Sequence, residues 1–355
     1  MPLNPPRADH LLGAIEGFYG RPWRATERQQ LVSDLAGLGL NAYLYAPKAD
    51  AHLRRRWPEP WPAAEARALA ALADHCDACG IALGLGLSPF RLYEDYGPAA
   101  RRSLQRRIGE LNGFGAPLLA ILFDDMPGNC PDLAARQGEI VADVAAWSSA
   151  RQLLVCPTYY SDDTVLDRVF GPRPPAYREA LGAALPEGVQ ILWTGREVCA
   201  PAIAGEDLAT AARAFGRPVT LWDNWPVNDG AKRSQHLYLD PPPAREGALT
   251  PACAGHLCNA MNQPVLSLPA LAGLAALHGR IAAARPWLED RLGPAVAAAL
   301  AADAAAFRDR RRDALSDEER VRLQARYGAL PGAAAREVLA WLDGAWTFDP
   351  DCLTD

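Results

Sequence analysis

The stretch LLAILFDD, residues Leu118 to Asp125, joins an apolar run to two adjacent carboxylates. A continuous apolar run of this length is typical of a strand that is buried on both faces, as in a parallel sheet. Adjacent aspartates repel each other and are costly to desolvate, so their position at the end of such a strand requires a chemical reason. They could hold a metal ion, or they could divide acid and base chemistry between them.

Similar short runs of apolar, β-branched or aromatic residues occur seven more times along the chain. They lie at residues 13–19, 41–47, 81–89, 153–160, 189–195, 219–225 and 255–261. Segments of helical character separate most of them, at residues 25–39, 63–80, 99–115, 132–150, 176–185 and 206–216. This alternation predicts an α/β protein with a (β/α)8 TIM barrel, whose usual length is about 250 residues.

The predicted barrel occupies residues 11–275, after an N-terminal extension at 1–10. Its seventh connection, residues 226–252, is rich in proline and predicts a long ordered loop. Residues 276–355 are rich in alanine, leucine and arginine and predict a small C-terminal α-helical region. We expect this region to pack against the barrel or against a partner subunit in a homo-oligomer.

Two helix starts carry a capping-box pattern, in which a hydroxyl residue is followed three positions later by Glu or Gln. Thr26 with Gln29 predicts the start of the first helix, and Ser316 with Glu319 predicts the start of a helix in the C-terminal region.

Composition excludes several classes of function. A net charge of -6 argues against a nucleic-acid surface, and the basic run at residues 54–56 is expected to be a solvated face. The start of the chain does not read as a signal peptide, and no run approaches the roughly 20 apolar residues needed to cross a membrane. The eight cysteines are scattered, which favours free thiols over disulfides. A cytoplasmic location is therefore expected.

Polar and aromatic side chains follow nearly every predicted strand. They are Glu16, Tyr19, Lys48, Tyr159, Tyr160, Thr194, Trp222, Asp223, Asn224, Asn259 and Asn262. Active sites of TIM barrels lie at the carboxyl ends of the strands, and two consecutive aspartates can face one pocket only where the strand ends and the backbone turns. The pattern predicts a pocket for a hydroxyl-rich ligand with aromatic walls.

Seven blocks of residues occur in an order and spacing that resemble glycoside hydrolase family 84, the β-N-acetylglucosaminidases that include protein O-GlcNAcases. The blocks are GAIEGFYGRPW (13–23), NAYLYAPKAD (41–50), LFDDM (122–126), CPTYY (156–160), WTGREV (193–198), LWDNWPVND (221–229) and NAMNQP (259–264). The resemblance covers residues 11 to 265, which is essentially the whole predicted barrel.

This resemblance implies a retaining mechanism in which the 2-acetamido oxygen of the substrate attacks the anomeric carbon and forms an oxazoline, without a metal or other cofactor. By position, Asp124 would accept the acetamido N–H and offset the positive charge that develops. Asp125 would protonate the leaving oxygen and later activate water. An ionised Asp124 would help to keep a proton on Asp125 near neutral pH.

The resemblance also assigns the substrate-binding residues. Tyr160 would steady the acetamido oxygen, Trp222 would form a wall for the methyl group, and Asn224 would support the two aspartates. The sugar hydroxyls would be bound by the Gly17 carbonyl, Lys48, Asp229 and Asn259. Asp223 would face away from Asn224 and serve the structure.

The favoured function is an exo-acting β-N-acetylglucosaminidase, since residues around the 3-, 4- and 6-hydroxyls would close the pocket at the non-reducing end. The substrate would be a glycoprotein, a glycopeptide or a small glycoside. The alternatives are a hyaluronidase-type endo-acting enzyme, a catalytically silent sugar-binding barrel, and a metal-dependent hydrolase that uses Asp124, Asp125, Asp223 and Asp229.

Overall fold

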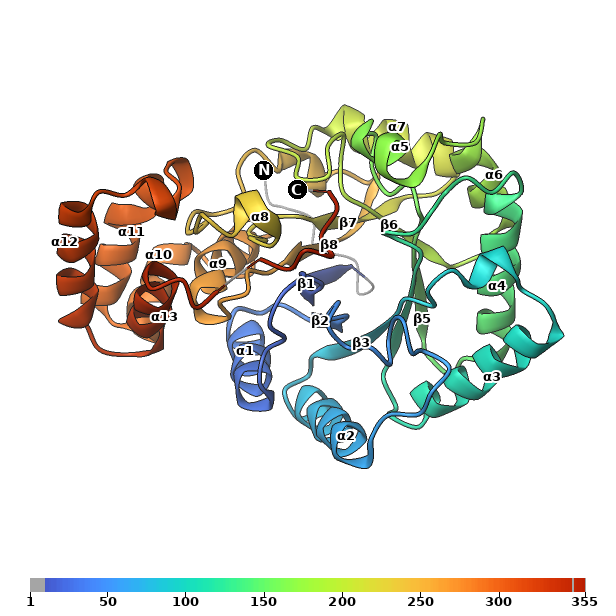
Figure 1. The fold of residues 1–355 in the computed structure, drawn as a ribbon, viewed down its shortest axis with the longest axis horizontal. Coiled ribbons are helices and arrows are strands. Elements are labelled where there is room, and N and C mark those ends of the chain that lie inside the picture. Colours follow the sequence, from blue (N-terminus) through green and yellow to red (C-terminus); the bar gives the residue numbers. More distant parts are fainter. Residues whose placement is uncertain (1–9, 347, 355) are drawn as a thin grey trace.

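The computed structural model describes residues 10–346 and 348–354, and within them eight parallel strands form a closed barrel (Figure 1). The strands are β1 (Leu11–Glu16), β2 (Ala42–Tyr45), β3 (Ala82–Leu87), β4 (Leu118–Leu122), β5 (Gln152–Cys156), β6 (Gln190–Trp193), β7 (Val219–Asp223) and β8 (Cys253–Asn259). They pair in chain order, and β8 pairs with β1 in parallel, with Leu11 opposite Gly255. The predicted TIM barrel is confirmed.

Burial explains why these runs form strands. Every residue of β1 and of β4 is buried, because one face points into the barrel and the other contacts the surrounding helices. A strand that is covered on both faces needs apolar side chains at successive positions, which is the pattern of Leu118–Leu122.

Helices surround the barrel, as Figure 1 shows. Those of the barrel units are α1 (Ala25–Gly37), α2 (Ala63–Ala78), α3 (Pro98–Asn112), α4 (Leu133–Trp147), α5 (Val165–Phe170), α6 (Tyr177–Ala184), α7 (Gly205–Phe215) and α9 (Leu268–Leu277). Short 3-10 turns, η1 (Leu92–Glu94) and η3 (Val265–Ser267), precede α3 and α9. The seventh connection is mostly loop, as predicted, and contains α8 (Gly230–Arg233) and η2 (Glu246–Leu249).

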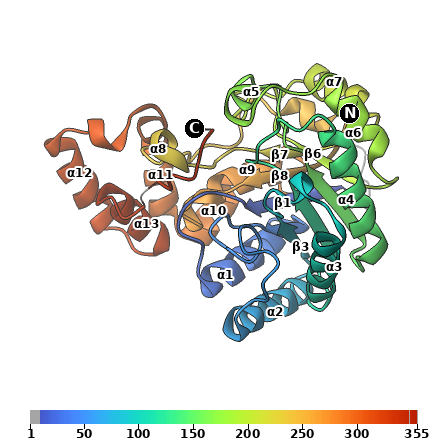
Figure 2. The same ribbon diagram turned by 45° about the vertical axis from the view of Figure 1, so that its right-hand side comes forward.

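The C-terminal region is helical and lies to one side of the barrel (Figures 1 and 2). It contains α10 (Ala284–Leu292), α11 (Pro294–Asp309), η4 (Arg312–Ala314), α12 (Asp317–Gly328) and α13 (Ala333–Leu342). A second hydrophobic core joins side chains of α11 to α13 with Leu237 and Tyr238 of the seventh connection. The long loop after β7 therefore packs against the C-terminal helices.

The division of the chain at residue 275 falls inside α9, which ends at Leu277. Of the N-terminal extension at 1–10, only His10 belongs to the described residues. None of the helices in the described part of the chain combines the length and apolar character needed to cross a lipid bilayer. All eight cysteines lie in the described residues and outside disulfides, but only Cys76, Cys156, Cys253 and Cys258 are buried.

Candidate active site

Asp124 and Asp125 lie just beyond the end of β4, where the backbone changes direction. Asp125 has a φ of 57°, in the left-handed region that aspartate tolerates better than most residues. This turn allows consecutive side chains to face the same side, which a continuing strand would forbid. Both are largely buried, with 5% and 9% exposure, and both line one cavity.

Lys48 follows β2 and forms a short ion pair with Oδ2 of Asp124, while its Nζ lies 3.7 Å from Oδ2 of Asp125. Burial raises the pKa of Asp124, Lys48 opposes this effect, and the neighbouring Asp125 adds to it. Oδ1 of Asp124 is buried and has no hydrogen-bond partner among the described residues. Asp124 therefore retains an acceptor that a bound ligand could use.

Two phenols hold the Asp125 carboxyl group. The Tyr160 hydroxyl donates to Oδ1 over 3.1 Å, and the Tyr19 hydroxyl donates to Oδ2 over 2.8 Å. Arg54 in turn donates to the Tyr19 oxygen over 3.0 Å. Asp124 and Asp125 are adjacent in sequence, yet Lys48 is hydrogen-bonded to Asp124 and lies farther from Asp125, which accepts its hydrogen bonds from neutral phenols.

Arg54 corrects the interpretation of the basic run at 54–56. Arg55 and Arg56 are exposed as expected, but Arg54 is only 5% exposed and stacks over the Tyr19 ring at 5.2 Å from its centroid. The sequence analysis named Tyr19 as a polar side chain after a strand but gave it no role, whereas the structure shows its hydroxyl bound to Asp125. No local signal distinguishes Arg54 from its neighbours.

Trp222, the fourth residue of β7, forms a wall of the cavity and packs against Gly17. A Cβ on Gly17 would lie 2.5 Å from the Trp222 ring, so only glycine allows this approach. The backbone N–H of Gly17 donates to Oδ1 of Asn259 over 3.2 Å. Gly17 is thus held between Trp222 and Asn259, and all three residues line the cavity.

Asn224 was expected to support the aspartates, but its hydrogen bonds lie elsewhere. Its Oδ1 accepts from Trp222 Nε1 at 3.0 Å and from Asn259 Nδ2 at 2.9 Å, and its Nδ2 donates to the Val198 carbonyl at 2.7 Å. Because both donors to Oδ1 are themselves cavity residues, Asn224 positions Trp222 and Asn259 in the cavity.

Asp229 precedes α8, and its Oδ2 accepts the backbone N–H of Tyr19 over 2.8 Å. Burial raises its pKa to about 6, although the Tyr19 N–H and Arg233 act in the opposite direction. Asp229 completes the set, since all nine site residues predicted from the sequence line the same cavity: Gly17, Lys48, Asp124, Asp125, Tyr160, Trp222, Asn224, Asp229 and Asn259.

Other strand-end groups lie outside the cavity. Glu16 is fully buried and is bound by Arg28 and Tyr43, and the Tyr159 hydroxyl donates to the Gly171 carbonyl over 2.7 Å. The cavity also includes residues without a predicted role, namely Tyr19, Cys156, Thr194, Val198, Cys199, Val227, Arg233, Cys352 and Thr354.

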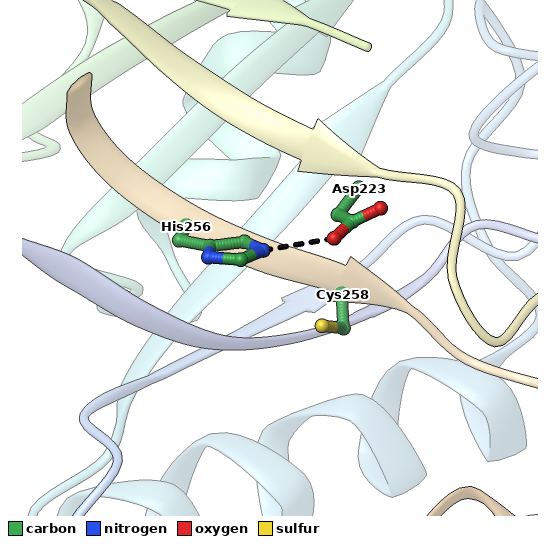
Figure 3. Close-up of side chains that lie close together, drawn as sticks. All are labelled: Asp223, His256 and Cys258. Carbon is green, nitrogen blue, oxygen red and sulfur yellow. Dashed lines mark hydrogen bonds and ion pairs between the residues drawn. The ribbon is translucent and has the colours of Figure 1, made fainter. Parts of the chain in front are cut away.

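Asp223 ends β7 and points to a separate buried cluster (Figure 3). Its Oδ2 lies 3.0 Å from His256 Nε2, and Arg245 binds both of its oxygens at 2.7 and 2.9 Å. Asp223, His256 and Cys258 have metal-ligand atoms within 4.8 Å of one another. The Arg245 cation already satisfies the carboxylate and would repel a metal ion, so Asp223 serves the structure and is not part of a four-aspartate metal site.

Paired carboxylates in one cavity, at the carboxyl ends of the strands of a TIM barrel, are typical of glycoside hydrolases. The chain belongs to the β-N-acetylglucosaminidase family, since the model of the family described as beta-N-acetylglucosaminidase matches residues 12–297. The resemblance carried by the seven sequence blocks is thereby confirmed.

Individual relatives agree with this membership. The chain is 30% identical over 258 residues to the protein O-GlcNAcases of Mus musculus and of Rattus norvegicus, covering 70% of this chain but only 28% of each relative. It therefore spans less than a third of the length of these curated relatives. A solved O-GlcNAc hydrolase from Thermobaculum terrenum superimposes with a TM-score of 0.76 at 26% identity, covering 94% of this chain and 80% of that one.

Proposed function

We propose that the protein is a retaining exo-β-N-acetylglucosaminidase that removes terminal β-linked N-acetylglucosamine through an oxazoline intermediate. The observation that carries the proposal is the unequal environment of two adjacent aspartates in one cavity. Asp124 is paired with Lys48 and has a spare acceptor oxygen, whereas Asp125 is oriented by Tyr19 and Tyr160.

Asp124 is the group that positions the nucleophile. Its unpartnered Oδ1 accepts the acetamido N–H of the substrate, which aims the acetamido oxygen at the anomeric carbon. Lys48 favours the ionised form of Asp124, and that negative charge offsets the positive charge on the forming oxazoline ring. Holding an internal nucleophile in this way corresponds to effective molarities of about 10^5 M or more.

Asp125 acts first as acid and then as base. Its carboxyl group is oriented by hydrogen bonds from two phenols, Tyr19 and Tyr160. When substrate binds, Tyr160 turns its hydroxyl to the acetamido oxygen. Asp125 then gives its proton to the leaving oxygen, and the resulting carboxylate activates water against the oxazoline.

The remaining groups select the sugar. Gly17, Lys48, Asp229 and Asn259 bind the hydroxyls, and Trp222 receives the acetyl methyl group. A pocket closed around the 3-, 4- and 6-hydroxyls has no room for a chain that continues from the 4-oxygen. An exo mode is therefore favoured over the hyaluronidase-type endo mode.

The natural substrate we propose is a glycoprotein, a glycopeptide or a small glycoside, and the relatives named as protein O-GlcNAcases support the first two. We further propose that the protein acts in the cytoplasm, that it uses no metal or other cofactor, and that it binds neither nucleic acid nor a membrane. The C-terminal helices are proposed to form a separate region from residue 276, which also offers a surface for a homo-oligomer.

One set of substrates tests this function. Aryl β-N-acetylglucosaminides with acetyl, mono-, di- and trifluoroacetyl groups should be turned over progressively more slowly, because fluorine withdraws electron density from the attacking oxygen. The first product seen by NMR should be the β-anomer, and exhaustive EDTA treatment should leave the rate unchanged. A flat fluorine series, an initial α-anomer or a rate restored by a divalent ion would contradict the mechanism.

A further inference from the structure

Residues 348–354, here called the strap, lie against the cavity that holds the two aspartates. The chain runs from the C-terminal helices back to the barrel, as Figures 1 and 2 both show. Cys352 and Thr354 line the cavity together with Asp125 and Tyr160. The side chain of Thr354 lies close to the Tyr160 hydroxyl.

The strap lies where the proposed substrate would bind. In the substrate complex the Tyr160 hydroxyl would face the acetamido oxygen, but here it donates to Asp125 and lies close to Thr354. Cys352 and Thr354 border the space beside Asp125 and Tyr160 that the sugar would occupy. Strap and sugar therefore compete for that space.

One ion pair on the surface of the protein holds the strap to the barrel. The Asp351 carboxylate pairs with Arg55 at 2.8 Å, but these side chains are 47% and 58% exposed. Exposed ion pairs stabilise little and are screened by salt. The large apolar side chains of the strap, Phe348 and Leu353, are also mainly solvent-facing. By contrast, Trp346, which precedes the strap, is stacked by Arg21 at 4.6 Å from its ring centroid. The chain is thus held at Trp346, just before the strap, whereas the ion pair of Asp351 within the strap is weakened by solvent.

We propose that residues 348–354 form an autoinhibitory strap that must leave the cavity before the sugar enters. The inference rests on the proposed function only in that the sugar occupies this cavity. When only a fraction of the molecules is open, the apparent affinity for substrate falls by that fraction, so one open molecule in ten raises the KM about tenfold. The kcat is unaffected, because every substrate-bound molecule is already open.

Reversing the charges of the Arg55–Asp351 pair tests the strap in the full chain. Arg55→Glu and Asp351→Arg should each lower the KM for an aryl β-N-acetylglucosaminide, by up to about fivefold at constant kcat, which is the contribution of an exposed ion pair. The double variant Arg55→Glu/Asp351→Arg restores a pair and should return the KM towards the wild-type value. Higher salt should lower the KM of the wild type but not that of Arg55→Glu. An unchanged or raised KM in both single variants, with normal turnover, would overturn the strap and leave the proposed function intact.

Cys352 provides a second measurement that needs no turnover. Its rate of alkylation by iodoacetamide, followed by mass spectrometry, should rise several-fold in Arg55→Glu and, in the wild type, on addition of N-acetylglucosamine. Cys253 is buried in β8 and should react equally slowly in all samples. A Cys352 rate that stays constant in Arg55→Glu, or that falls when the sugar is added, would mean that residues 348–354 are a fixed wall and would overturn the proposal. A wild type that never hydrolyses the aryl substrate would refute the proposed function instead.

Discussion

Asp124 and Asp223 are buried carboxylates near the ends of two strands of the barrel, and they differ in how their oxygens are satisfied. After β4, Asp124 is paired with Lys48 and keeps one oxygen without a partner in the described residues. At the end of β7, both oxygens of Asp223 are bound by Arg245, and one also contacts His256.

The pKa shifts follow this difference. Burial would raise the pKa of either group, and it does so for Asp124 in spite of Lys48. For Asp223, the hydrogen bond from His256 and the charge of Arg245 overcome burial and hold the pKa below its ordinary value. A satisfied buried carboxylate stabilises a fold, whereas one with spare acceptor capacity and a raised pKa is suited to a ligand.

The largest effect is expected for Asp223→Ala, which leaves Arg245 buried without its anion. We expect the free energy of unfolding to fall by about 3–5 kcal/mol, measured by chemical denaturation, while the folded fraction keeps a kcat near that of the wild type. Replacing the pair together, as Asp223→Leu/Arg245→Met, should recover part of the loss. Normal stability with a strongly reduced kcat would show that Asp223 takes part in the reaction, and Asp124 and Asp223 would then not differ in role.

Tyr19→Phe should have an intermediate effect, which is expected on the activity and not on the stability of the protein. It removes a hydrogen bond to a carboxylate, a contact that contributes about 1.5–3 kcal/mol, so kcat/KM should fall about 10- to 100-fold. Tyr159→Phe is the matched control, because that hydroxyl donates to the Gly171 carbonyl outside the cavity. Equal losses in the two variants would show that the hydrogen bond from Tyr19 to Asp125 is not the cause of the loss.

A smaller effect is expected in the pH dependence of substrate binding. Asp229 has a pKa of about 6, so it is ionised above that pH and protonated below it. If it accepts a hydrogen bond from a sugar hydroxyl, the KM should rise as the pH falls through 6. The rise should be about tenfold, because losing one hydrogen bond weakens binding by about that factor. Asp229→Asn should show a raised KM without this dependence. A wild-type KM that is flat across this range would remove Asp229 from the sugar site.

The sequence was sufficient to predict the barrel and nine of the residues that line the cavity. Runs such as Leu118–Leu122 are continuously apolar because both faces are covered, and parallel strands bring their carboxyl ends to one rim. Residues after different strands, such as Lys48 and Asp229, therefore converge although they are distant in the chain. The capping box of Ser316 and Glu319 was likewise correctly predicted.

Side-chain partners were less predictable. The predicted box of Thr26 and Gln29 was wrong, since α1 begins at Ala25 and Glu27 accepts the backbone N–H of Arg24 over 2.6 Å. Several neighbouring residues can cap this helix, and the sequence alone does not separate them. The burial of Arg54 and the hydrogen bonds of Asn224 depend on contacts between distant elements, as does the position of the strap beside Tyr160. No local pattern encodes such contacts.

The division of labour between Asp124 and Asp125 is tested most directly by comparing Asp124→Asn with Asp125→Ala on two leaving groups, with and without azide. Asp125→Ala should lose about 10^2- to 10^4-fold on an alkyl glycoside but little in the first step on a dinitrophenyl glycoside. Azide, which needs no general base, should accelerate its turnover and give a β-glycosyl azide. Asp124→Asn should be impaired on both substrates and unaffected by azide, because aiming the acetamido group is needed for any leaving group. The same leaving-group dependence and azide response in both variants would contradict the account.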